Sequence, residues 1–223
     1  GADAGEVDPF ALPSLTGRVA ALLGAMHGCW RDRADWYLIV DDDTFVRPAE
    51  LRSAIQRLDP GAPQMFGVPT STEPFVLPGH RARFGPSVHC GGSAVLLSRG
   101  LVSRLAGLLG ECLSGPPRTT LAWYWDEVEL LGRCVYEHLR LNCSSLPPGR
   151  MLSAGGPADV EALASDASGL AALATLHPVE PAQMLRLERL FGQSAPHGGA
   201  DASVRQPSAG AGRISPPAPS KPG

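Results

Sequence analysis

A run of five apolar residues ends in three consecutive aspartates in the segment WYLIVDDDTF, residues 36–45. Because all five residues are apolar instead of every second one, we predict a strand over 36–40 with both faces covered, as in the parallel sheet of an α/β protein. Two ionised carboxylates about 4 Å apart repel by about 4 kcal/mol at an effective dielectric near 20. We therefore expect a positive group beside Asp41, Asp42 and Asp43.

The chemistry of these carboxylates favours a hard divalent cation such as Mn²⁺ or Mg²⁺, which in turn binds diphosphate oxygens. Open α/β sheets bind their ligands at the carboxyl ends of the strands. If the strand continues, Asp41 and Asp43 share one side and Asp42 takes the other. The alternative is a solvated turn in which one aspartate caps the next helix. We favour the metal site because three charges directly follow an apolar strand.

The rest of the chain up to residue 192 predicts a single domain that mixes helices and strands. Apolar residues at helical spacing indicate helices over 12–30, from Pro48 to about Leu58, from a Ser98 cap to about Leu109, and over 122–142. The segment QMFGVP, residues 64–69, predicts a strand, and HCGGSAVLLS, residues 89–98, predicts a glycine turn that leads into a second strand. We expect residues 193–223 to be a disordered tail, because Val204 and Ile214 are their only large aliphatic residues.

Composition excludes several classes of function. The net charge is −3 and the basic residues form no stripe, so we expect no nucleic-acid partner. No window approaches the roughly 18 to 20 apolar residues of a membrane span. The five cysteines show no C-x-x-C spacing, so we expect no structural zinc site. Their number leaves open whether they form up to two disulfides or remain buried thiols.

Four motifs in order resemble the Fringe-like, family 31 glycosyltransferases. They are ADWYLIVDDDTFV, HCGGSAVLLSRGLV, WDEVELLGRC and TLHPVEP, and the resemblance covers about residues 14–191. It implies a GT-A fold, which is a Rossmann-like α/β domain. It also implies inverting transfer of a sugar from a UDP-sugar donor to a hydroxyl of a glycan or glycoprotein acceptor, usually in β1,3 linkage and with Mn²⁺ (or Mg²⁺).

The resemblance assigns the aspartates and one histidine to the donor and metal sites. Asp41 and Asp42 would contact the donor, and the metal ligands would be Asp41, Asp43 and His177, the last lying in TLHPVEP. Without the resemblance, a lone histidine beside a proline is more often an ordinary turn residue. We therefore expect His177 to approach the aspartates from a distant part of the chain.

The resemblance also indicates where the cleft and the catalytic base lie. Gly91 and Gly92 would line the donor and acceptor cleft, or they would form only a turn before a strand. The base would be Asp126, or else Glu127; Glu129 could serve if the helix shifts register, because one residue too many separates DEV from LGRC. The alternative for these carboxylates is a solvated acidic first turn of a helix.

Three adjacent aromatic residues precede the predicted base. Trp123 and Trp125, together with Tyr124, could stack on the acceptor sugar, or they could belong to the core.

The family's setting has further implications. The resemblance implies a disulfide between Cys112 and Cys134 and a type II membrane protein of the Golgi or ER lumen, with any membrane anchor upstream of this chain. Asn142-Cys143-Ser144 is a formal N-glycosylation sequon. Only 40 residues precede the aspartates, fewer than in the family, so we expect a catalytic domain that is incomplete at its N-terminus and lacks the first strands.

Two other functions remain open. A lectin-like module or pseudoenzyme of the same fold would keep the architecture and lack transfer. A metal-dependent phosphohydrolase would use the same acidic turn and release phosphate without a sugar acceptor.

Overall fold

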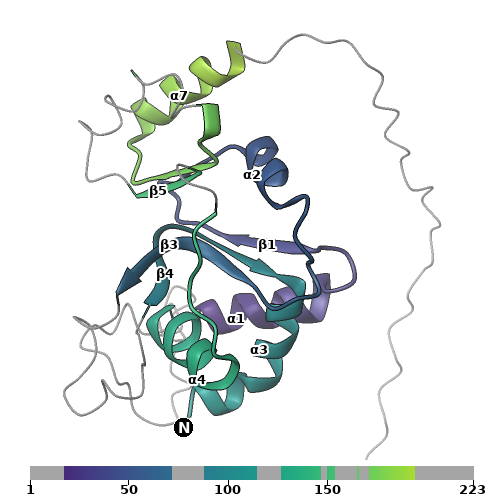
Figure 1. The fold of residues 1–223 in the computed structure, drawn as a ribbon. Helices are drawn as coiled ribbons and strands as arrows, with labels where there is room; N and C mark the ends of the chain where they lie inside the picture. The colour runs from purple at the N-terminus through teal and green to yellow at the C-terminus, as the bar shows by residue number, and fades with distance from the viewer. Residues whose placement is uncertain are drawn as a thin grey trace, which may run out of the picture.

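A computed structural model describes residues 18–71, 88–114, 127–146, 150–153, 165 and 171–193. These residues form a mixed α/β structure with two small sheets (Figure 1). The helices are α1 (Arg18–Ala25), η2 (Met26–Trp30), α2 (Pro48–Ile55), α3 (Arg99–Cys112), η6 (Glu127–Cys134), α4 (Val135–Leu139) and α7 (Pro181–Gln193). The strands are β1 (Trp36–Ile39), β2 (Phe45–Val46), β3 (Met65–Ser71), β4 (Val88–Ser98), β5 (Met151–Ser153) and β6 (Thr175–His177).

The larger sheet has the order β1-β4-β3 and is antiparallel throughout. The prediction of a parallel sheet around residues 36–40 is therefore wrong. Both faces of β1 contact a core, as expected, but Val40 lies beyond the strand and is 41% exposed. Tyr37 and Ile39 pack in a core with α1, α3 and η6, whereas Trp36 and Leu38 pack in a second core with α2. Helices α1, α3 and α4 lie on one side of this sheet, and α2 and α7 lie on the other (Figure 1). Coverage of both faces, and not strand direction, accounts for the unbroken apolar run.

The smaller sheet has the order β2-β6-β5 and positions the candidate site. Strand β6 pairs antiparallel with β2 and parallel with β5. Beside this sheet, α7 buries Leu187 in a third core with Phe45, Leu173, Leu176 and Val179.

Two predicted helix starts are confirmed. Pro48 occupies the first turn of α2, where its missing N–H costs nothing. The Ser98 side chain caps α3, because its Oγ accepts a hydrogen bond from the Leu101 N–H at 3.2 Å.

No helix in the described ranges combines the length and apolar content needed to cross a bilayer. Of the predicted tail, residue 193 is the last residue of α7, and the rest lies outside the described residues from position 194 onward.

Two expected α-helices contain π-helical segments. The first continues from α1 into η2, and the second passes from η6 into α4. The first helix buries Val19 and Leu23 but leaves Leu22 and Trp30 exposed, so only part of its apolar pattern faces the core.

The paired glycines lie inside β4 and form no turn. Gly91 pairs with Val68 of β3 and is buried. A Cβ atom on Gly91 would lie 3.1 Å from His89 Nε2 and 3.1 Å from Thr70 Oγ1. The absent side chain therefore leaves room for a buried histidine, which is a structural reason for glycine at this position.

His89 is expected to make the stability of the folded chain depend on pH. The side chain is fully buried, and desolvation lowers the pKa of His89 to about 4, with hydrogen bonding to the Thr70 backbone opposing the shift. The unfolded chain therefore binds the extra proton first as the pH falls below about 6.5. We expect about 3 kcal/mol of stability to be lost progressively between pH 6.5 and pH 4.

Urea unfolding at several pH values measures this loss. The His89→Phe variant lacks the titrating group, so its pH slope over that window should be flatter than that of the unmodified chain. Equal slopes in the two proteins would contradict the assignment.

Two disulfides connect the core. The predicted pair Cys112–Cys134 is confirmed, and Cys90–Cys143 forms a second bond that the sequence did not assign. Cys29 is a free, exposed thiol. Gly67 lets β3 approach the second bond, since a Cβ there would lie 2.8 Å from Cys90 Cβ.

Candidate metal centre

A two-residue strand pairing brings the aspartates to the histidine. β1 ends at Ile39, and the chain turns through the aspartates before β2 begins at Phe45. Phe45 pairs with Leu176 of β6, so the residues just before β2 lie beside the residue just after Leu176, which is His177. The antiparallel register therefore places the two distant motifs side by side.

Three potential ligand atoms converge at this point. His177 Nε2 lies 3.1 Å from Asp43 Oδ1 and 3.7 Å from Asp41 Oδ2. The ligand atoms of the three side chains all lie within 4.8 Å of one another. We call Asp41, Asp43 and His177 the metal triad. We expected a positive group beside the aspartates. Among the described residues, the imidazole of His177 lies in that place, and it carries positive charge only when protonated.

Backbone hydrogen bonds hold the triad in place. The Val179 N–H donates to the Asp43 carbonyl at 2.9 Å, and the Thr44 N–H donates to the Asp41 carbonyl at 3.2 Å. The first of these bonds ties the segment after His177 directly to the acidic turn. The two halves of the triad are therefore fixed by main-chain contacts and not only by their side chains.

Arg47 strengthens the support behind the triad. Its backbone N–H donates to Ala174 at 2.8 Å, and its Nη1 donates to the Leu173 carbonyl at 3.0 Å. Its Nη2 pairs with Glu50 at 3.1 Å, and its guanidinium lies 3.8 Å from the centre of the Phe191 ring. Arg47 thereby joins β2, α2, α7 and the segment that leads into β6. The sequence analysis did not single out this residue.

The donor set fits a divalent cation. Two carboxylates and one imidazole are suitable ligands for Mn²⁺, and carboxylates alone would suit Mg²⁺. The Nε2 atom of His177 faces the carboxylates. Its Nδ1 atom is buried and has no hydrogen-bond partner among the described residues. The Asp41 side chain is 67% exposed and that of Asp43 is 45% exposed, which leaves access from solvent. An ion held by these three side chains would therefore keep further positions for a ligand.

Asp42 faces a cavity beside the triad. A cavity of about 500 Å³ is lined by Asp42, Asp43, Val179, Pro181, Met184, Leu185 and Glu188. Asp43 thus belongs both to the triad and to the cavity wall. The sequence analysis missed the α7 residues of this wall, although Pro181, Met184, Leu185 and Glu188 share one helical face by their spacing.

The other predicted site residues are only partly placed. Gly91 lies within β4 against Thr70 and His89. Gly92 also belongs to β4, and the structure does not describe what surrounds it. Asp126, Trp123 and Trp125 lie outside the described residues. The roles assigned to all five of these residues stay predictions.

The helix that follows the predicted base begins at Glu127 and is π-helical through Cys134. A π-helix bonds residue i to i+5 instead of i+4, so it absorbs one additional residue without breaking the helix. This geometry offers a physical account of the surplus residue between DEV and LGRC. The side chains of Glu127 and Glu129 are not described.

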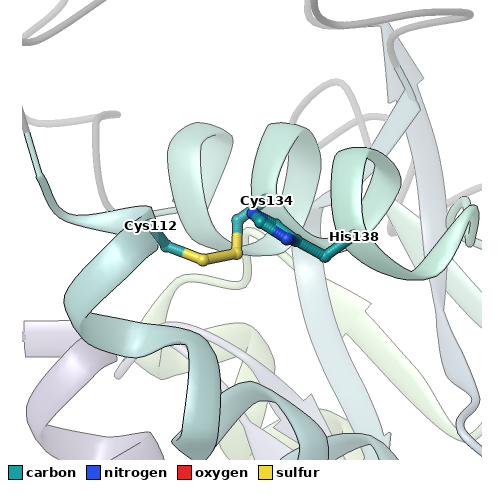
Figure 2. Close-up of side chains that lie close together, drawn as sticks. All are labelled: Cys112, Cys134 and His138. Carbon is teal, nitrogen blue, oxygen red and sulfur yellow. A yellow bond between two sulfur atoms is a disulfide. The ribbon is translucent and has the colours of Figure 1, made fainter.

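A second group of potential ligands consists of Cys112, Cys134 and His138. Figure 2 shows that the two sulfur atoms are bonded to each other, with the His138 ring beside them. A metal ligand must be a thiolate, so the oxidised pair cannot serve as one. This group is a disulfide with a neighbouring histidine, in keeping with the absence of zinc-type spacing in the sequence.

Comparison with known proteins identifies a related enzyme. Over 165 residues the chain is 33% identical to the human chondroitin sulfate glucuronyltransferase. The chain is homologous to part of a glycosyltransferase. The match covers 70% of this chain but 19% of the relative, so the chain spans about a fifth of that protein. No family model matches the chain.

The homology agrees with the architecture. A mixed α/β structure with an antiparallel sheet is consistent with a GT-A-like fold, and the predicted fold class is confirmed. The narrower resemblance to the Fringe-like family remains an expectation from the motifs.

Proposed function

We propose that this chain is part of the catalytic domain of a metal-dependent, inverting glycosyltransferase. It would transfer a sugar from a UDP-sugar to a hydroxyl of a glycan or glycoprotein acceptor, in β1,3 linkage. The observation that carries the proposal is the meeting of Asp41 and Asp43 with His177. The homology to a glycosyltransferase supports it independently.

The metal triad would hold Mn²⁺ or Mg²⁺. When bound, such an ion would supply positive charge that neutralises the diphosphate of the leaving UDP. Asp41 and Asp42 would contact the donor as well. These assignments use side chains on the acidic turn and on β6, which a backbone hydrogen bond between Val179 and Asp43 joins.

The remaining chemistry is the removal of a proton from the acceptor. We assign this step to Asp126, with Glu127 as the second choice. The acceptor oxygen forms a bond to the anomeric carbon from the face opposite the diphosphate, and the carbon–oxygen bond to the diphosphate breaks. The proton of the acceptor hydroxyl passes to the carboxylate, a contribution worth about 10² to 10⁴ in rate.

We further propose that the protein acts in the Golgi or ER lumen. Two disulfides among the described residues support an oxidising compartment. The relative is named for glucuronyl transfer on chondroitin sulfate. An acceptor of the glycosaminoglycan type that ends in an uncharged sugar ring is therefore the first substrate to assay.

The proposed donor site predicts a ligand effect on thermal stability. UDP and Mn²⁺ together should raise the melting temperature, because a ligand at 100 times its Kd stabilises a fold by about 2.7 kcal/mol. For a chain of this size the shift should be several degrees. Each ligand alone should have a smaller effect, since the metal and the diphosphate contribute ligands to one another.

The measurement is a thermal melt with UDP, with Mn²⁺, with both, and with neither. EDTA should reverse the combined shift. A folded sample that shows no combined shift would contradict the proposed donor site and would favour the lectin-like alternative. Phosphate release from UDP without a sugar acceptor would favour the phosphohydrolase.

A further inference from the structure

The cavity between the acidic turn and α7 has two kinds of wall, and we call it the α7 cavity. Its apolar wall consists of Val179, Pro181, Met184 and Leu185, and its acidic wall consists of Asp42, Asp43 and Glu188. Its volume of about 500 Å³ is within the range of small-molecule sites, roughly 300–1,000 Å³.

The core contacts of α7 set which of its side chains form the apolar wall. Leu187, on another face of α7, is buried in the core with Phe45, and this contact fixes the rotation of the helix. Met184 packs against the same core and also lines the cavity, whereas Leu185 lines the cavity and stays 57% exposed. A large aliphatic side chain held at the rim of a cavity gains free energy when a ligand covers it.

The charge of the cavity is negative. Asp42 and Glu188 provide two carboxylates beyond Asp43, which belongs to the metal triad. None of the described lining residues is basic. The arginines of α7 lie elsewhere, because Arg186 and Arg189 line a separate cavity with Ala182 and Leu190.

These features together match one class of ligand. A sugar ring has an apolar C–H face and hydroxyl groups that donate hydrogen bonds, which suit the aliphatic wall and the carboxylates respectively. The carboxylates of the acidic wall would repel a ring that carries a carboxylate or a sulfate. Such repulsion is an effective way to discriminate against an anionic ligand.

We infer that the α7 cavity binds an uncharged sugar ring of a substrate and that Glu188 selects against anionic rings. This inference rests on the proposed function, since Asp43 links the cavity to the metal triad. Leu185 and Met184 support the C–H face of the ring. Glu188 and Asp42 accept hydrogen bonds from its hydroxyls.

The test uses two sugars that differ at one position. Methyl β-glucoside and methyl β-glucuronide differ only in a hydroxymethyl or a carboxylate group at C6. We expect the glucoside to shift the methyl NMR signals of Met184 and Leu185, and the glucuronide to bind about fivefold more weakly. Removal of one exposed charge in Glu188→Gln should reduce that discrimination by about fivefold.

A matched control removes an equal charge elsewhere. Glu111 is exposed at the end of α3, away from the cavity lining, and Glu111→Gln should leave the discrimination unchanged. The absence of methyl shifts with either sugar would overturn the inference. So would equal binding of the two sugars, or a discrimination that Glu188→Gln leaves intact.

The same samples separate this inference from the proposed function. If UDP and Mn²⁺ still raise the melting temperature while the sugars show no selectivity, only the cavity assignment fails. If the combined shift is absent, the proposed function fails.

A second pair, UDP-glucose and UDP-glucuronate, identifies the substrate. Loss of discrimination in Glu188→Gln between the nucleotide sugars places the donor sugar in the cavity. Loss between the free glycosides alone places the acceptor there.

Discussion

Replacing Asp43 with alanine should abolish the expected stabilisation by UDP and Mn²⁺ together, because Asp43 is the carboxylate closest to His177, at 3.1 Å. Loss of even an indirect partner of a metal ligand commonly weakens metal affinity 10- to 100-fold, so loss of a ligand itself should cost about 100-fold or more. The combined thermal shift should therefore disappear at Mn²⁺ concentrations that saturate the unmodified chain. Isothermal titration with Mn²⁺ alone provides a second measurement of the same loss.

Two further variants make this result specific. Glu111→Ala removes an exposed carboxylate from α3 and should keep the full shift. Asp126→Asn should also keep the shift while stopping sugar transfer, because we assign it to proton removal and not to metal binding. A full shift in Asp43→Ala would refute the metal triad, and normal transfer by Asp126→Asn would refute the assigned base.

Removal of the Cys90–Cys143 bond has the largest expected effect on stability. The bond joins residues 53 positions apart, and the chain-entropy relation gives about 4 kcal/mol for a loop of that length. It also anchors the segment around Ser144, which hydrogen-bonds to β3 through Gly67 and Met65. The double variant Cys90→Ala with Cys143→Ala should therefore melt about 10 °C lower than the unmodified chain.

The other cysteines provide internal controls. The Cys112–Cys134 bond closes a separation of 22 residues, for which the same relation gives about 3 kcal/mol. Cys29→Ser should leave the melting temperature unchanged, because that thiol is free and exposed. Equal melting temperatures for the Cys90–Cys143 double variant and the unmodified chain would contradict the prediction.

Local sequence determined several elements of the fold. Ser98 and Pro48 marked helix starts because capping and the first helical turn depend on the residue type at one or two positions. The apolar run from Trp36 indicated a strand covered on both faces for the same kind of local reason. Its neighbours could not be deduced in this way, since strand pairing depends on residues far apart in the chain, and the predicted parallel sheet proved antiparallel.

The candidate site shows the same division. The three aspartates suggested a cation site from the cost of adjacent charges, but His177 was selected only through a motif resemblance. The structure gives a physical reason for its position: the pairing of Phe45 with Leu176 brings His177 next to Asp43. The α7 cavity was not foreseen, because its lining joins one face of a helix to a turn that lies far away in the sequence.

By itself, the sequence determined that an apolar strand ends in a cluster of carboxylates, where two of the helices begin, and that the cysteines lack zinc-type spacing. Only the tertiary structure decided which strands pair, that Cys90 bonds to Cys143, and how the three side chains named by the motif resemblance come together beside the acidic turn. The physical reason is range. Caps, turns and periodicity act over a few residues, whereas pairing, disulfide bonding and ligand convergence depend on which distant segments pack together.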